Sequence, residues 1–131
     1  MENHSDLSKN FIPYDLALEL KELGFDGECF GFYDLSYKCR LAFTSDQNFY
    51  EQQKCSAPTF SQAFRFFREK YNFVSEINVY STSDGYSFSF KILCKKYTPY
   101  IEANNAWILY EEAELTCIRK LIEIAKEQNV K

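Results

Sequence analysis

The sequence predicts a protein of the α+β class, with a mainly antiparallel sheet of about four strands from two hairpins, covered by three helices. Two observations support this prediction. Two pairs of segments alternate between polar and apolar residues, as hairpin strands do, and three segments carry apolar residues at helical spacing. Single helices interleaved with hairpins, in the order α-β-β-α-β-β-α, favour an antiparallel sheet with helices packed against it.

The length of 131 residues fits one domain. We therefore expect residues 1–131 to form a single domain, with residues 1–9 as a flexible tail and residues 10–130 as the globular part. The N-terminal stretch MENHSDLSKN is polar and mixed in charge, unlike a signal peptide. No apolar run approaches the roughly 18 residues that a membrane span needs. We expect a cytoplasmic protein without membrane contact.

The first helix is predicted in FIPYDLALELKELGF. Pro13 suits the first turn of a helix, where the missing N–H of proline is not needed. Leu16, Leu20 and Leu23 recur at i, i+4 and i+7, which places them on one face. Gly24 is well placed to end the helix in a left-handed conformation.

A hairpin and a long loop are predicted next. The strands are CFGFYD, from Cys29, and YKCRLAF, from Tyr37, and the short turn DLS joins them. The stretch TSDQNFYEQQKCSA, from Thr44 to Ala57, is polar and has no clear period, so we expect a loop. A loop of that length is often functional, and whether this one is functional is left open.

The second helix is predicted in APTFSQAFRFFREKYNF. Thr59 and Gln62 have the spacing of a capping box at its start, and Asn72 is a suitable stop. Phe66 and Lys70 share a flank outside the apolar face. The apolar face consists of Phe60, Ala63, Phe64, Phe67 and Tyr71.

The second hairpin has the strands VSEINVYS and YSFSFKILC, and the pair Asp84–Gly85 is a strong signal for the turn between them. The second strand alternates, so that one face is expected to carry Tyr86, Phe88, Phe90, Ile92 and Cys94. A turn-rich stretch, KKYTPYIEANNA, follows. The last helix is predicted from about Leu109 to Gln128.

Catalytic and cofactor chemistry finds little support in the sequence. The only histidine, His4, lies in the polar tail, and the glycines match no phosphate-binding motif. The five cysteines form no C-x-x-C pair and are expected to be reduced. A trio of carboxylates, Glu111, Glu112 and Glu114, is the one candidate for a Mg²⁺ site. Acidic residues at a helix start are normal, so we expect no metal, no cofactor and no enzyme activity.

The net charge of −4 argues against broad nucleic-acid binding but leaves room for a local basic pocket. Arginines beside aromatic rings recognise phosphates and stacked bases. The predicted second helix contains such a group, Arg65 and Arg68 with neighbouring aromatic residues. A second basic group follows the last predicted strand. The candidate ligand-binding residues are Arg65, Arg68, Lys95, Lys96, Tyr97 and Tyr100. Whether the two groups converge is left open.

Tyrosines near strand ends and in loops offer another surface, because tyrosine is enriched at protein interfaces. The tyrosines in such positions are Tyr33, Tyr37, Tyr50, Tyr80, Tyr97 and Tyr100. The same residues are also normal at the edges of a sheet. Position alone therefore does not distinguish an interface tyrosine from one at the edge of a sheet.

The pairing of APTFSQAFRFFREKYNF with YEEAELTCIRKLIEIAKE resembles small uncharacterised proteins encoded by phages and prophages of gut anaerobes. The layout helix–strand–strand–helix from Phe60 to Gln128 also resembles the phage ABA sandwich domains. The resemblance covers about the C-terminal half of the chain. It carries no catalytic motif.

The resemblance implies a small, non-catalytic accessory protein of phage type that acts by binding, with counter-defence as the expected role. Two partners stay open, a host defence protein and a small anionic nucleotide signal that the protein would sequester. An alternative is a structural or assembly component of a phage that forms a homo-oligomer through its sheet edge.

Overall fold

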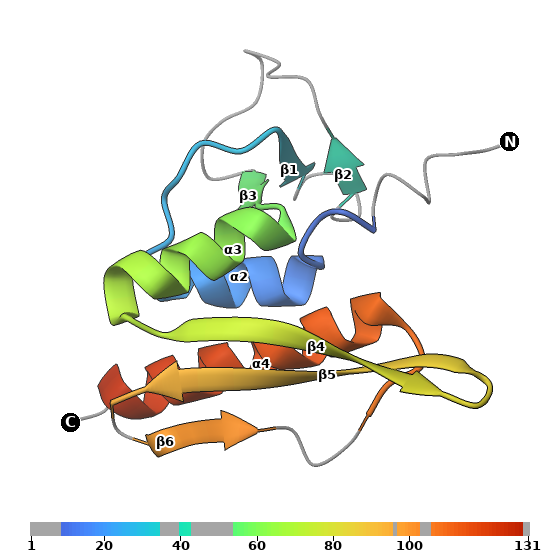
Figure 1. The fold of residues 1–131 in the computed structure, drawn as a ribbon. Helices are drawn as coiled ribbons and strands as arrows, with labels where there is room; N and C mark the ends of the chain where they lie inside the picture. The colour runs from blue at the N-terminus through green and yellow to red at the C-terminus, as the bar shows by residue number, and fades with distance from the viewer. Residues whose placement is uncertain (1–8, 35–39, 43–53, 96, 103–105, 130–131) are drawn as a thin grey trace, which may run out of the picture. The chain divides into compact units, whose positions relative to one another are not determined.

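A computed structural model describes residues 9–34, 40–42, 54–95, 97–102 and 106–129 of the chain. These residues contain three α-helices, of which the second continues into a π-helix, and two three-stranded antiparallel sheets (Figure 1). The α+β class is confirmed. The expected count of about four strands is corrected to six.

The chain divides into two compact units, Met1–Ala63 and Phe64–Lys131. Each unit holds one of the two sheets, and the boundary falls inside helix α3, Phe60–Phe66. The single domain expected for residues 1–131 stays a prediction. The expected flexible tail lies almost wholly outside the described residues.

The first unit contains helix α2, Tyr14–Glu22, and the sheet of order β2-β1-β3. Strand β1, Gly31–Asp34, pairs antiparallel with β2, Arg40–Ala42, so the predicted pairing of these two segments is confirmed. Their connecting residues, 35–39, lie outside the described residues.

The third strand of this sheet, β3, Lys54–Ala57, lies in the stretch predicted as a loop. It pairs antiparallel with β1, and Cys55 stands opposite Tyr33. Four residues are too few to show a period of two, and the partner strand is some twenty residues away. The loop prediction is therefore wrong at this end, while residues 44–53 of it lie outside the described residues.

The end of helix α2 confirms the predicted role of Gly24. This residue has φ 106°, in the region that favours glycine. The N–H of Phe25 donates to the carbonyl of Leu20 at 2.9 Å, and the N–H of Gly24 donates to that of Lys21 at 3.0 Å. These two bonds form a Schellman motif, which satisfies carbonyls that the helix end would leave open.

Helix α3 begins with the predicted capping box. The N–H of Gln62 donates to Oγ1 of Thr59 at 3.2 Å, and the N–H of Thr59 donates to Oε1 of Gln62 at 3.0 Å. The helix then widens into the π-helix η2, Phe67–Tyr71, which the sequence did not predict. Asn72 ends it with φ 60°, so the predicted stop is confirmed.

The second unit contains the sheet of order β4-β5-β6. Strands β4, Val74–Thr82, and β5, Gly85–Cys94, form the predicted hairpin in continuous register from Val74↔Leu93 to Thr82↔Gly85. Gly85 has φ 135° at the predicted turn. Strand β6, Tyr97–Glu102, replaces the predicted turn-rich stretch and pairs with β5. A third strand therefore stands between the hairpin and the last helix.

Helix α4, Tyr110–Asn129, agrees with the predicted last helix and packs against β5 and β4 along the sheet (Figure 1). Its apolar side is fully buried, and so are Phe90, Ile92 and Cys94 of β5. Opposite residues of an antiparallel pair share a face, so Ile77 lies on the face of Phe90. None of the helices in the described part of the chain is long and apolar enough to span a membrane.

Candidate functional site

The two arginines of the predicted site lie on the outer side of α3 and η2. Arg65 is exposed, and its Nε lies 3.7 Å from Oε2 of Glu69, one turn later. The two side chains form an i,i+4 ion pair on the surface of the helix. Both side chains are more than two thirds exposed, so the pair is screened and contributes little to stability. Arg68 is exposed on the π-helical turn.

The flank predicted for Phe66 and Lys70 is also present. The ammonium of Lys70 lies 5.7 Å from the centroid of the Phe66 ring and 5.7 Å from that of the Tyr71 ring. Both distances suit a cation–π interaction. The ring of Tyr71 stacks on the ring of Phe73, and the Tyr71 hydroxyl accepts a hydrogen bond from Nδ2 of Asn129 at 3.0 Å.

The remaining predicted site residues follow β5. Lys95 is exposed in the turn after that strand. Lys96 lies outside the described residues. Tyr97 and Tyr100 belong to β6, which corrects the turn expected there, and their side chains lie outside the described part. The backbone of Tyr97 is paired with Cys94.

The sheet register brings the two predicted groups to one end of the second unit. Val74, which begins β4, stands opposite Leu93, and Lys95 follows two residues later. The π-helix ends three residues before Val74. The hydrogen bond between Asn129 and Tyr71 places the end of α4 here as well. We call Arg68, Lys70 and Lys95 the basic end; the register joins their backbone segments and does not show their side chains in contact.

A second surface, which the sequence did not indicate as a site, lies at the opposite end of the hairpin. Phe88 exchanges two backbone hydrogen bonds of 2.7 Å with Trp107. The Trp107 ring stacks on Phe90 with centroids 5.8 Å apart, and Tyr110 meets Phe88 edge to face at 5.5 Å. Short-range aromatic pairs of this kind hold the rings in defined positions.

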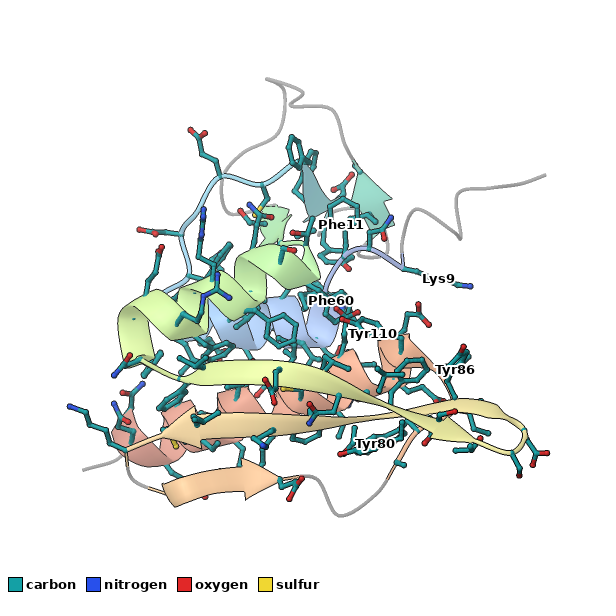
Figure 2. All side chains as sticks on the ribbon, in the orientation of Figure 1. Lys9, Phe11, Phe60, Tyr80, Tyr86 and Tyr110 are labelled. Carbon is teal, nitrogen blue, oxygen red and sulfur yellow. The ribbon has the colours of Figure 1, made fainter. Side chains whose placement is uncertain are left out.

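The apolar side chains around these pairs are open to solvent. Tyr86 is 67% exposed, Ile108 80% and Tyr110 43%. Figure 2 shows Tyr86 on the hairpin toward its turn and Tyr110 at the start of α4. We call the following residues the aromatic surface: Tyr86, Phe88, Trp107, Ile108, Leu109 and Tyr110. They come from β5, from the bridge that Trp107 forms with it, and from the start of α4.

Acidic residues border the aromatic surface. Glu111 and Glu112 are exposed in the first turn of α4, and Asp84 is exposed in the hairpin turn. Burial, and then the charge of Glu111, raise the pKa of Glu114 above its usual value. Burial, and then the charges of Glu114 and Glu111, raise the pKa of Tyr110 as well, so its hydroxyl is neutral and can donate a hydrogen bond.

The carboxylate trio considered for Mg²⁺ therefore lies at the start of α4, as expected. Among the described residues, no three His, Cys, Asp or Glu side chains gather closely enough to hold a metal ion. Burial raises the pKa of the Cys117 thiol to about 12 and that of Cys29 to about 11. A thiol with such a pKa is protonated at neutral pH and is a poor nucleophile.

The tyrosines expected to offer a surface differ in exposure in the structure. Tyr80 is 45% exposed, as expected. Tyr33 is buried, which is a correction: its hydroxyl donates to the carbonyl of Ile12, and its ring meets Tyr14 edge to face. Burial raises the pKa of Tyr33 to about 12. Tyr37, Tyr50 and the side chains of Tyr97 and Tyr100 lie outside the described part.

The sequence feature nearest to a signal for the aromatic surface is the apolar run Trp107–Ile108–Leu109 directly before an acidic helix start. Such a run normally enters the core, so its exposure in the structure is what distinguishes it from a core segment.

No protein-family model, curated protein or solved structure matches this chain.

Proposed function

We propose that this protein is a non-catalytic binding protein that acts by occupying a partner protein through the aromatic surface. The observation that supports this proposal most is the exposure of Tyr86, Ile108 and Tyr110 beside rings held by close pairs. Tyrosine and tryptophan dominate the binding energy of protein interfaces, and held rings lose little entropy on binding. Single exposed apolar residues need no explanation, but a contiguous group does.

The chemistry of the surface indicates the partner. An apolar centre with Asp84, Glu111 and Glu112 around it suits a partner whose apolar patch is bordered by lysine or arginine. The hydroxyl of Tyr110 adds a donor beside these carboxylates. Charges at the border speed association and select the partner, while the rings provide most of the affinity.

On the basis of the sequence resemblance to phage proteins, we propose a host defence protein as the partner class and counter-defence as the role. In that role the protein would work by stoichiometric occupation, which needs a surface and no catalytic group. The absence of any matching family leaves this role a prediction.

A crosslinking experiment tests the surface. A photoreactive amino acid replaces Ile108 in one variant and Gln128, exposed near the far end of α4, in a control variant. Expressed in a bacterial host that carries the defence system under test, the variant at 108 should crosslink to one component of that system, and the variant at 128 should not. Excess unlabelled wild-type protein should abolish the crosslink, and excess protein carrying Tyr86→Lys and Tyr110→Lys should not.

Equal crosslinking at both positions, or equal competition by both proteins, would contradict a role for the aromatic surface. The double variant must keep its thermal unfolding temperature close to that of the wild type for this comparison to hold. Tyr86 and Tyr110 are largely outside the core, so a small change is expected.

Sequestration of an anionic nucleotide is the second candidate, and the basic end is the observation that favours it. A phosphate would meet Arg68 and Lys95, and a base would meet the Phe66 and Tyr71 rings. However, the end of α4 lies here too, and cations beside a helix C-terminus are stabilising without any ligand. For this reason the protein partner is preferred.

Thermal unfolding in the presence of cyclic and linear nucleotides tests the second candidate. A ligand at about 100 times its Kd stabilises the folded state by about 2.7 kcal/mol, which is a clear shift. Arg68→Ala should remove the shift, and Lys21→Ala, on the exposed side of α2 in the first unit, should keep it. A panel that shifts nothing would exclude sequestration of those nucleotides.

A further inference from the structure

Within the second unit, the outer edge of strand β4 pairs with no described strand. β4 is the edge strand of the order β4-β5-β6, and within the described residues no backbone hydrogen bond joins it to a strand other than β5. Val74, Val79 and Tyr80 are 45%, 61% and 45% exposed. An edge of nine residues with unpaired N–H and C=O groups is a template for another strand, and natural proteins usually protect such edges with lysine, proline or a bulge. β4 has no lysine, proline or bulge, and its one charged side chain is Glu76.

The sequence of β4, VSEINVYST, is close to symmetric about Asn78. If two copies pair antiparallel with Asn78 opposite itself, Ile77 meets Val79 and Ser75 meets Ser81. On the other face Glu76 meets Tyr80, and Val74 meets Thr82. Each of the nine residues then has a partner, apolar residues meet apolar ones on the face that carries Ile77, and no two charges of one sign are opposed.

The other registers are worse for definite reasons. In an antiparallel pair, opposite residues point to the same face of the sheet. Two copies related by a two-fold axis perpendicular to the sheet meet this condition only when the axis passes through a residue, which then stands opposite itself. An axis at Glu76 would oppose two carboxylates, which is destabilising. An axis at Ile77 or Val79 shortens the overlap and places serine opposite an apolar residue.

We propose that two copies of this chain pair through β4 in the register centred on Asn78, so that the two sheets become one sheet of six strands. The partner is a second copy of the chain because the edge complements itself. The pairing uses the free edge of β4, whereas the aromatic surface comes from β5, Trp107 and the start of α4. A dimer of this kind therefore presents the aromatic surface twice.

Position 80 allows a matched test, because it faces Glu76 of the second copy in the proposed pairing and Ser87 within its own chain. Tyr80→Lys creates two opposite-charge pairs across the two-fold axis, and Tyr80→Glu creates two like-charge pairs. Lysine and glutamate are similarly disfavoured in strands, so the folded monomer is affected alike. We expect the dimer dissociation constant to fall roughly fivefold for Tyr80→Lys relative to the wild type and to rise roughly fivefold for Tyr80→Glu.

Sedimentation velocity over a concentration series measures these constants for the full chain, and Tyr86→Glu on β5 is the control that should leave them unchanged. A mass of twice 15.5 kDa with the opposite shifts at position 80 supports the proposal. A chain that stays monomeric at every concentration overturns it, and so does a dimer on which the two substitutions at position 80 have the same effect. Neither outcome affects the aromatic surface, whose own test is the crosslink at position 108.

Discussion

The two ends of the β4–β5 hairpin differ although they belong to the same pair of strands. At the basic end, Phe73, Ile92 and Cys94 are buried. At the turn end, Val79 and Tyr86 are exposed, although they lie on the face that Phe90 and Ile92 share. An identical alternation of apolar residues therefore produces core at one end and surface at the other.

The length of α4 explains the difference. The helix begins at Tyr110, whose ring meets Phe88, and its buried residues start at Ala113. Its far end reaches Tyr71 through Asn129. The hairpin thus extends past the start of α4, and Tyr86 lies beyond Phe88, where α4 does not reach. The comparison shows that a strand pattern alone does not separate a core position from a binding surface.

The largest expected effect concerns stability at the two ends. Ile92→Ala should lower the free energy of unfolding by about 2–5 kcal/mol, because it leaves a cavity under α4. Tyr86→Ala should lower it by less than about 1 kcal/mol, because that ring is largely solvated. Urea denaturation followed by circular dichroism measures both. Equal losses would show that the turn end is packed in the folded protein.

A second, smaller effect on the free energy of unfolding is expected at two residues with positive φ, Gly85 at the start of β5 and Asn72 before β4. Gly85→Ala should cost about 1–3 kcal/mol, because φ is 135° there. A Cβ at Gly85 meets no atom within 4 Å, so the backbone alone accounts for the loss. Asn72→Ala should cost less, about 0.5–1 kcal/mol, because φ 60° is the left-handed region that asparagine tolerates better than alanine.

Asn72→Gly is the matched control for this pair and should keep or slightly raise the free energy of unfolding. The same denaturation experiment applies. If Asn72→Gly destabilised the protein as much as Asn72→Ala, the side chain of Asn72, and not its conformation, would be the important feature.

The smallest effect concerns Glu114. Its folded-state pKa is raised, so the folded protein binds this proton more tightly than the unfolded chain does. The free energy of unfolding therefore falls as pH rises from about the usual value of 4.5 through the raised pKa. Glu114→Gln removes the penalty and should raise the free energy of unfolding at pH 7 by up to about 0.5 kcal/mol, since the group is partly exposed.

Thermal unfolding at pH 7 and at pH values below 4.5 measures this difference, and the gain should vanish in the acidic range. Glu112→Gln is the control at an exposed position of the first turn. It should lower the stability slightly, because it removes a negative charge from the helix N-terminus. A gain from Glu114→Gln that persists in acid would contradict the electrostatic cause.

The elements that sequence analysis predicted correctly carry their signal locally. The capping box of Thr59 and Gln62, the left-handed ends at Gly24 and Asn72, and the turn at Gly85 each depend on residues within a few positions. Sequence analysis missed the strands β3 and β6. β3 pairs with β1, which lies some twenty residues earlier in the chain. β6 contains Pro99, which normally argues against a strand but is tolerated at a sheet edge, where β6 lies.

The candidate site also combines features that are local in sequence with features that depend on pairing between distant segments. Arginines, lysines and neighbouring rings can be read directly from the sequence, and the register then brings their segments to one end of the sheet. The aromatic surface was not predicted as a site, because Tyr86 fits the apolar alternation of β5 and Leu109 fits the start of a helix. Exposure of such residues depends on what covers them, which local sequence does not encode.

The sequence by itself determined the α+β class, the three helices and the hairpins, because spacing, caps and turn residues act over a few positions. Only the tertiary structure decided that six strands form two sheets, that β4 is an edge, and that α4 stops short of the hairpin turn. These features depend on which distant segments pair and on how far one element extends over another. One end of the hairpin is buried and the other exposed because α4 covers only the first of them, and the extent of α4 over the sheet is a tertiary feature.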